Sequence, residues 1–128
     1  MEATMDAITG QLTAAGRQEA MYPYPADTIS APAVVVGYPT EIEYDSTFRR
    51  GSDRAVYPVW FVVPRTDPKK ARDDISAILA GARSIKDVLD GDLGGVVQAC
   101  RVTGAKPAFI DVGAVSYAAA EFTVEVYT

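Results

Sequence analysis

The chain has 128 residues, a length typical of one domain, so we expect a single domain over 1–128. Hydrophobic residues make up 48% and charged residues 23% of it, which excludes wholesale disorder, collagen-like repeats and a disulfide scaffold. The formal net charge of -5 has the wrong sign for a protein that binds nucleic acid by neutralising phosphates. The absence of histidine excludes the Ser-His-Asp triad, the Cys-His dyad and the H-E-x-x-H zinc site.

Cys100 is the only cysteine, so no internal disulfide and no multi-cysteine metal site can form. It lies in the apolar run between Val97 and Val102, which predicts a buried, unreactive thiol. The start of the chain carries Glu2 and Asp6 and does not resemble a secretory signal. No run approaches the roughly 18 apolar residues that a membrane span requires. We therefore expect a soluble intracellular protein with no membrane partner.

The first predicted elements are a helix and a short buried strand. Apolar residues at spacings of three or four predict an amphipathic helix over 2–15 that ends at Gly16. Prolines predict an extended segment over 21–25. The run 33–37 predicts a strand that is apolar on both faces and is therefore covered from both sides. The apolar residues of the helix are Met5, Ile8, Leu12 and Ala15.

The segment 40–53 is the most polar part of the chain. Its acidic residues alternate with Ile42 and Tyr44, which predicts a half-exposed strand followed by a projecting arm around 45–54. Such an arm is either a contact surface or a mobile, solvated turn. It carries a basic cluster beside an aromatic residue, which we expect to dock onto an acidic protein surface rather than nucleic acid. The basic residues are Arg49, Arg50 and Arg54, and the aromatic residue is Phe48.

The run 54–64 is the most strand-like part of the chain, and Pro58 interrupts it. Because proline cannot donate to a ladder, we expect an edge strand or a bulge at this residue. Both faces are apolar, so one chain alone would leave an edge strand partly uncovered, and a subunit partner is predicted. One face carries Val56, Trp60 and Val62, and the other carries Tyr57, Val59, Phe61 and Val63.

Two helices and three strands are predicted in the second half of the chain. Asp67 followed by proline predicts the start of a helix that ends at Gly81. Ser84 opens a capping box, which predicts a shorter helix that ends at Gly91. Strands are predicted over 96–103, 108–112 and 115–127, with turns at 104–107 and 113–114. In the last strand the polar face consists of Glu121, Thr123 and Glu125.

This order of elements predicts an α+β fold with a mostly antiparallel sheet packed by an N-terminal helix and two central helices. The glycine-rich loops that bind nucleotides are absent from the sequence. The segment 90–95 is similar to the start of a calcium loop, but Gly94 and Arg101 occupy positions where ligands belong. Asp73 and Asp74 diverge on their helix and do not form an acid–base pair. We therefore expect no catalytic residue, no cofactor and no metal.

The ordered combination of segments resembles a family, the tail terminator proteins of long-tailed bacteriophages with non-contractile tails. The resemblance covers nearly the whole chain and begins with the amphipathic N-terminal helix. It continues through 31–37, 43–45, 50–54, 57–59, 83–86 and 93–97.

The resemblance implies a subunit of a hexameric ring that caps the finished tail tube, stops its polymerisation and joins the tail to the head. The implied partners are further copies of the chain, the tail tube protein and the head-completion or neck protein. Genomic DNA would pass through without specific binding. The implied location is the head-proximal end of the virion tail, after assembly in the host cytoplasm.

Contacts within such a ring are inferred from the residues. We expect the interface to include Tyr44, Phe48, Arg49, Arg50, Arg54 and Trp60. Glu121 and Glu125 either line the lumen, where they would repel DNA, or are outer-face charges. Two other functions stay open: a head-closure or connector protein of the same neck, and a stand-alone oligomer that binds a ligand or acts on it at a subunit interface. The order of the ring and the face that meets the tube stay open as well.

Overall fold

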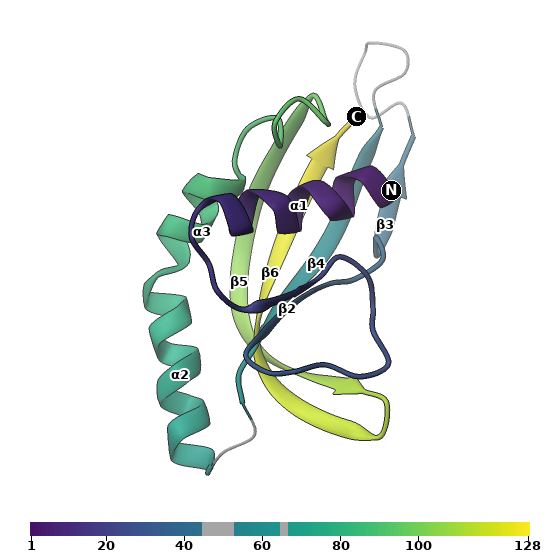
Figure 1. The fold of residues 1–128 in the computed structure, drawn as a ribbon. Helices are drawn as coiled ribbons and strands as arrows, with labels where there is room; N and C mark the ends of the chain where they lie inside the picture. Colours follow the sequence, from purple (N-terminus) through teal and green to yellow (C-terminus); the bar gives the residue numbers. More distant parts are fainter. Residues whose placement is uncertain (45–52, 65–66) are drawn as a thin grey trace.

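The computed structural model describes residues 1–44, 53–64 and 67–128. Within them, three helices pack against a six-stranded, mostly antiparallel sheet, which confirms the predicted α+β class (Figure 1). The helices are α1 (Glu2–Ala14), α2 (Pro68–Ala80) and α3 (Ala82–Leu89). The strands are β1 (Ala20–Tyr22), β2 (Ala33–Val36), β3 (Glu41–Glu43), β4 (Arg54–Val62), β5 (Ala99–Val112) and β6 (Val115–Tyr127).

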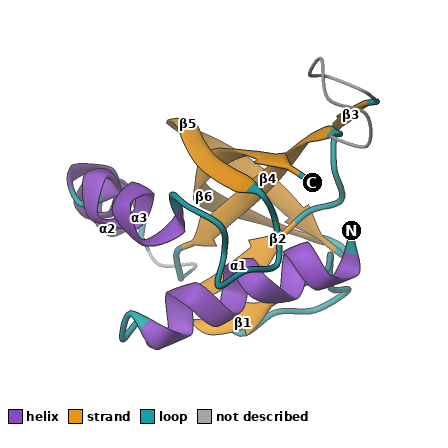
Figure 2. Ribbon diagram, turned by 90° about the horizontal axis from the view of Figure 1, so that it is seen from above, coloured by secondary structure: helices purple, strands orange, loops and turns teal. Residues whose placement is uncertain are grey.

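The strands follow the order β1-β2-β4-β6-β5, and β3 pairs with the first part of β4. Among the described strands only β1 and β2 are parallel. The tip of the long β5–β6 hairpin curves away from α2, toward the segment that connects β1 and β2 (Figure 1). Helix α1 crosses one face of the sheet, whereas α2 and α3 lie on the β5 side of the molecule (Figure 2). The sheet therefore has one face that is partly covered by helices and one outer face.

Helix α1 forms as its apolar spacing predicts. Met5, Ile8 and Leu12 are buried, whereas Ala15 is exposed because the helix ends just before it. Gly16 follows with a φ of 90°, a left-handed conformation that glycine adopts without strain.

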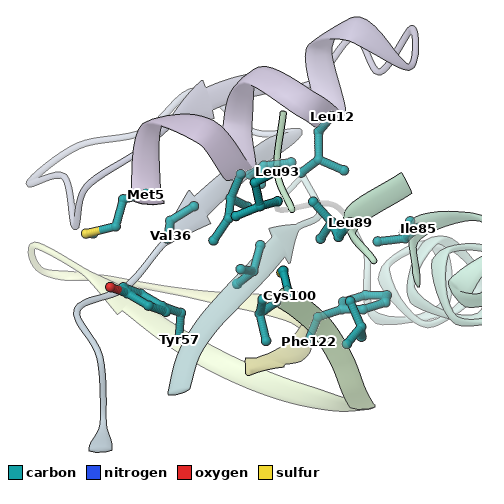
Figure 3. Packing of buried hydrophobic residues seen from close by; sticks show 14 of the residues in the cluster. Met5, Leu12, Val36, Tyr57, Ile85, Leu89, Leu93, Cys100 and Phe122 are labelled. Carbon is teal, nitrogen blue, oxygen red and sulfur yellow. The ribbon is translucent and has the colours of Figure 1, made fainter. Parts of the chain in front are cut away.

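The main core lies between the helices and the sheet (Figure 3). Leu12 of α1 and Leu89 of α3 point toward Leu93 in the loop that follows α3, and all three are buried. Phe61 and Phe122 from the sheet belong to the same core, with their ring centroids 5.0 Å apart and their planes tilted by 53°. Burial of this apolar area is the main force that holds α1 and α3 on the sheet.

Strand β4 is central, so the prediction of an edge strand or a bulge at Pro58 was wrong. Strand β6 pairs with β4 in unbroken register on one side, while β2 and β3 share the other side. The carbonyl of Pro58 accepts a hydrogen bond from the Gly37 nitrogen at 2.9 Å, so Pro58 faces the connection between β2 and β3. In an antiparallel strand the N–H of a residue lies on the same side as its carbonyl. On that side of β4, neither β2 nor β3 pairs with Pro58, so the lack of an N–H costs no hydrogen bond of the sheet. The argument for a subunit partner that rested on an uncovered β4 therefore fails.

Helix α2 begins as predicted, because the Asp67 carboxylate accepts a hydrogen bond from the Lys70 nitrogen at 2.8 Å. The predicted capping box at Ser84 was wrong. Helix α3 begins at Ala82, directly after Gly81, and Ser84 lies inside its first turn. Ile85 of this helix is buried, whereas α2 contains no buried residue.

The predicted turn at 104–107 was also wrong, since β5 runs through it as one strand of 14 residues. The register with β6 shifts between Val102 and Gly104, so glycine here marks a bulge rather than a turn. The predicted turn at 113–114 is confirmed, with Gly113 at a φ of 61° between β5 and β6.

The outer face of the sheet carries a second, smaller apolar cluster around Val35 and Val62. Ile29 and Ala31, from the segment between β1 and β2, pack against this cluster. Both faces of β2 are thus covered by the same chain, as predicted for this strand. The rest of the outer face is more polar and holds four of the eight predicted site residues, namely Arg54, Trp60, Glu121 and Glu125.

Candidate functional site

A network of charged side chains centres on Arg54, at the start of β4 on the outer face. Its guanidinium lies 3.1 Å from a Glu125 oxygen, 3.2 Å from a Glu41 oxygen and 3.6 Å from a Glu43 oxygen. The Tyr127 hydroxyl donates a 2.5 Å hydrogen bond to the other oxygen of Glu125. One cation therefore holds carboxylates from β3 and β6 together across β4.

The network fixes the charge of its members. Hydrogen bonds from Arg54 and Tyr127 lower the pKa of Glu125, and the same carboxylate raises the pKa of Arg54. The bond to Glu125 also raises the pKa of the Tyr127 hydroxyl. Since the donors of Arg54 already point at carboxylates of its own chain, the network stabilises strand pairing rather than offering a cation to a ligand.

The structure places the predicted site residues in different surroundings. Phe48, Arg49 and Arg50, with residues 45–52 of the predicted arm around 45–54, lie outside the described residues. Tyr44 follows β3 and is 71% exposed, as a contact residue would be. Arg54 lies in the ion-pair network, with only 23% of its side chain exposed.

Trp60 and the two predicted lumen residues lie on the same outer face as Arg54. Trp60 pairs directly with Glu121 across β4 and β6, and the Glu121 carboxylate lies 3.6 Å from the ammonium group of Lys106. The Trp60 ring is half-buried and packs against Gly37. Two of the predicted interface residues, Arg54 and Trp60, thus share one face of the sheet with Glu121 and Glu125, and a cation lies beside each glutamate.

Sequence reasoning missed an apolar groove between α2 and the β5–β6 hairpin. The groove has a volume of about 350 Å³, and its walls are Ala71, Ile75 and Leu79 of α2 and Pro107 and Phe109 of β5. Phe109 is 83% exposed, more than any other large apolar residue of the described chain. The apolar run from Ala108 to Ile110 predicts a strand. This pattern does not reveal that α2 leaves the helix-side face of the hairpin uncovered at Phe109.

A second hollow, of about 270 Å³, lies between the start of α1 and the segments on either side of β2. Aromatic side chains of Tyr24 and Tyr38 line it, and both are more than half exposed. Glu2 and Asp6 of α1 also line it, which makes the hollow acidic. Tyr24 belongs to the segment 21–25, which was predicted to be extended and whose tyrosines were expected to pack or to lie at an interface, whereas Tyr38 was not predicted as a contact.

Cys100 is buried, as predicted, and burial raises the pKa of its thiol to about 12. The neighbouring Asp90 closes this part of the β5 edge, since its carboxylate accepts a 3.0 Å hydrogen bond from the Val102 nitrogen. Among the described residues, no group of three or more Cys, Asp or Glu side chains is arranged to hold a metal ion.

Comparisons with known proteins identify no relative: no protein-family model matches the chain, and no curated protein matches its sequence. None of the helices in the described ranges is both long enough and apolar enough to cross a membrane.

Proposed function

We propose that the chain is a ring-forming tail terminator, which caps the tail tube of a long-tailed bacteriophage and joins it to the neck of the head. The order of sequence segments that resembles this family supports the proposal. The α+β architecture with an N-terminal helix and two central helices is compatible with a tail-terminator-like fold. The function is structural and uses no catalytic residue, cofactor or metal.

One observation carries the proposal, namely the apolar surface that a single chain leaves uncovered. The groove beside α2 and the exposed Phe109 side chain form a continuous apolar surface of the kind that marks protein–protein contacts. The sequence led us to expect a subunit partner at β4. The uncovered apolar surface instead lies between α2 and the β5–β6 hairpin. An oligomer would bury it.

The polar outer face suits a surface that DNA passes without binding. Six chains with a net charge of -5 each would carry about -30 in total, which repels phosphates. Glu121 and Glu125 face this side, and their neighbours Lys106 and Arg54 reduce the local negative charge. If these glutamates line the lumen, their reversal to lysine slows DNA ejection. Unchanged ejection rejects that role.

The first experiment measures the native mass by light scattering across a concentration series and images the same sample, mixed with cognate tail tubes, by electron microscopy. A mass near 82 kDa, about six times 13.7 kDa, or rings seated on tube ends, supports the proposal. A stable dimer or trimer that ignores tubes contradicts it.

Copurification with tail tubes in the absence of heads separates a tail terminator from a head-closure or connector protein, which would stay with heads. A saturable thermal shift with a small molecule would favour the stand-alone ligand-binding oligomer, because a ligand that binds the native state raises its stability.

A further inference from the structure

Phe109 is an apolar side chain without cover in its own chain. It projects from the helix-side face of β5 beside α2, and Pro107 and Ala118 line the same groove. Arg72 of α2 lines the same groove, with 70% of its side chain exposed. The groove therefore presents an aromatic side chain next to a positive charge.

The hollow at the start of α1 has the complementary character. Tyr24, Tyr38 and Met5 supply apolar walls, while Glu2 and Asp6 supply negative charge. Its volume of about 270 Å³ is ample for an aromatic ring, since a cavity of about 150 Å³ is already large enough to bind benzene.

The two surfaces are built from different parts of the chain. In both views the N-terminal end of α1 and helix α2 lie toward opposite ends of the molecule, although both helices pack on the same face of the sheet (Figures 1 and 2). Two unlike, complementary surfaces on separate parts of one chain produce head-to-tail association, which closes into a ring when the rotation between neighbours allows it.

We propose that Phe109 of one copy inserts into the hollow between Tyr24 and Tyr38 of the next copy, where Arg72 faces Glu2 and Asp6. This inference rests on one part of the proposed function, namely that the chain associates with further copies of itself. It adds which residues form the contact. An aromatic anchor in a pocket with a charged rim is the usual form of an interface hot spot. To form the new contact, Arg72 would give up its ion pair with Asp73. That pair is exposed, with a distance of 3.4 Å, and pairs of this kind contribute little to stability.

The free edge of β5 favours this side-chain contact over the pairing of strands between copies. Asp90 and Gly91 cover the edge at Cys100 and Val102. Beyond them, the bulge at Gly104 distorts the edge without ending the strand, and Pro107 lacks an N–H donor; both features oppose edge-to-edge pairing.

A mixing experiment tests the contact. Phe109→Ser removes the inserted side chain but keeps the hollow, while Tyr38→Asp blocks the hollow but keeps Phe109. Each variant alone should sediment as a monomer, whereas an equimolar mixture should form dimers and nothing larger, because each pair retains one intact contact. Val96→Ser, another exposed apolar substitution, is the matched control and should keep the wild-type mass.

A charge exchange supplies the second measurement. Arg72→Glu and Asp6→Lys should each weaken self-association at least tenfold, and the double variant should recover most of the loss, because the opposite charges face each other again. Arg83→Glu on α3, whose side chain is 81% exposed outside the groove, controls for the change in net charge.

The inference is overturned if wild type stays monomeric over the whole concentration series, if Phe109→Ser keeps the wild-type mass, or if the mixture of variants stays monomeric. These results are independent of tube capping. Head-to-tail association without capping would contradict only the proposed function, and capping by Phe109→Ser at wild-type mass would contradict only this contact.

Discussion

The ion pair between Arg54 and Glu125 runs diagonally across the β4–β6 ladder. The direct partner of Arg54 is Tyr127, and that of Glu125 is Val56, yet the two charged groups lie 3.1 Å apart. This diagonal places the Arg54 guanidinium within reach of Glu41 on β3 as well. Diagonal neighbours at this spacing are in reach of long side chains, so one arginine can stabilise three strands at once.

We expect Glu125→Gln to reduce the loss of stability in acid. The pKa of Glu125 lies below its ordinary value of 4.5 because Arg54 and Tyr127 bond to the ionised carboxylate. A lowered folded-state pKa gives stability that is present above about pH 4.5 and is lost as the pH falls through the folded-state value. Thermal unfolding should therefore be measured for wild type and Glu125→Gln between about pH 7 and pH 3. The wild-type protein should have the higher unfolding temperature at about pH 7, and the difference between the two should shrink as the pH falls.

Glu121→Gln is the control for that experiment, since it removes a carboxylate of the same strand that faces Lys106 at 3.6 Å. It should keep more of the wild-type acid sensitivity than Glu125→Gln does. An acid-induced loss in Glu125→Gln equal to that of wild type would show that the Arg54 pair contributes no stability.

Gly37→Ala should destabilise the fold by about 1–3 kcal/mol, as overpacking of a filled site does. A Cβ there would lie 2.6 Å from the Trp60 ring and 2.8 Å from the Pro58 ring, and both rings are held within the sheet. In contrast, Gly10→Ala in α1 meets no atom within 4 Å and should stabilise the helix by about 0.5–1 kcal/mol. Chemical denaturation of the two variants measures both signs, and equal effects would refute the steric reason.

Much of the fold could be predicted from local patterns. Helices α1 and α2 follow from apolar spacing and the Asp67 cap, and the β5–β6 turn follows from Gly113. The errors at Pro58 and over 104–107 share one cause. A proline interrupts a strand only where its missing N–H would face a paired neighbour, and a glycine can form a bulge where the partner strand continues past it; both depend on the order of strands in the sheet.

The candidate site was less predictable than the fold. Arg54 and Glu125 are 71 positions apart, and only the sheet order brings them together. The exposure of Phe109 depends on how closely α2 packs beside the hairpin, which no periodicity encodes. By contrast, alternation alone correctly placed Glu121 and Glu125 on the face opposite the core.

Phe122→Ala should cost about 3–5 kcal/mol, the usual range for removal of a buried aromatic ring. Phe122 is fully buried and contacts the Phe61 ring at 5.0 Å beneath the helices, so its loss opens a cavity in the main core. The free energy of unfolding in urea measures the cost. A loss below about 1 kcal/mol would mean that the surrounding side chains collapse into the space.

Asp67→Ala should destabilise α2 by about 1 kcal/mol, because it leaves the Lys70 N–H without its side-chain acceptor. No residue of α2 is buried, so this helix depends on its cap more than α1 or α3 does. Native-state hydrogen exchange should show the α2 amides less protected than those of α1, and less still in the variant. Asp67→Asn retains a capping oxygen and should restore protection, whereas equal protection of α1 and α2 would contradict the expectation.

Cys100 should not react with thiol reagents in the folded protein. Burial raises the pKa of its thiol to about 12, and nearby Asp90 adds to the shift, so almost none of the reactive thiolate exists at about pH 8. Labelling with a disulfide reagent should therefore proceed only as fast as the chain opens, and denaturant should accelerate it. Asp90→Asn removes the acceptor charge that holds Lys86 and the β5 edge, so it should speed labelling by exposing this edge more often. Rapid labelling of the native wild-type protein would show that the edge at Cys100 opens freely and that Asp90 does not protect it.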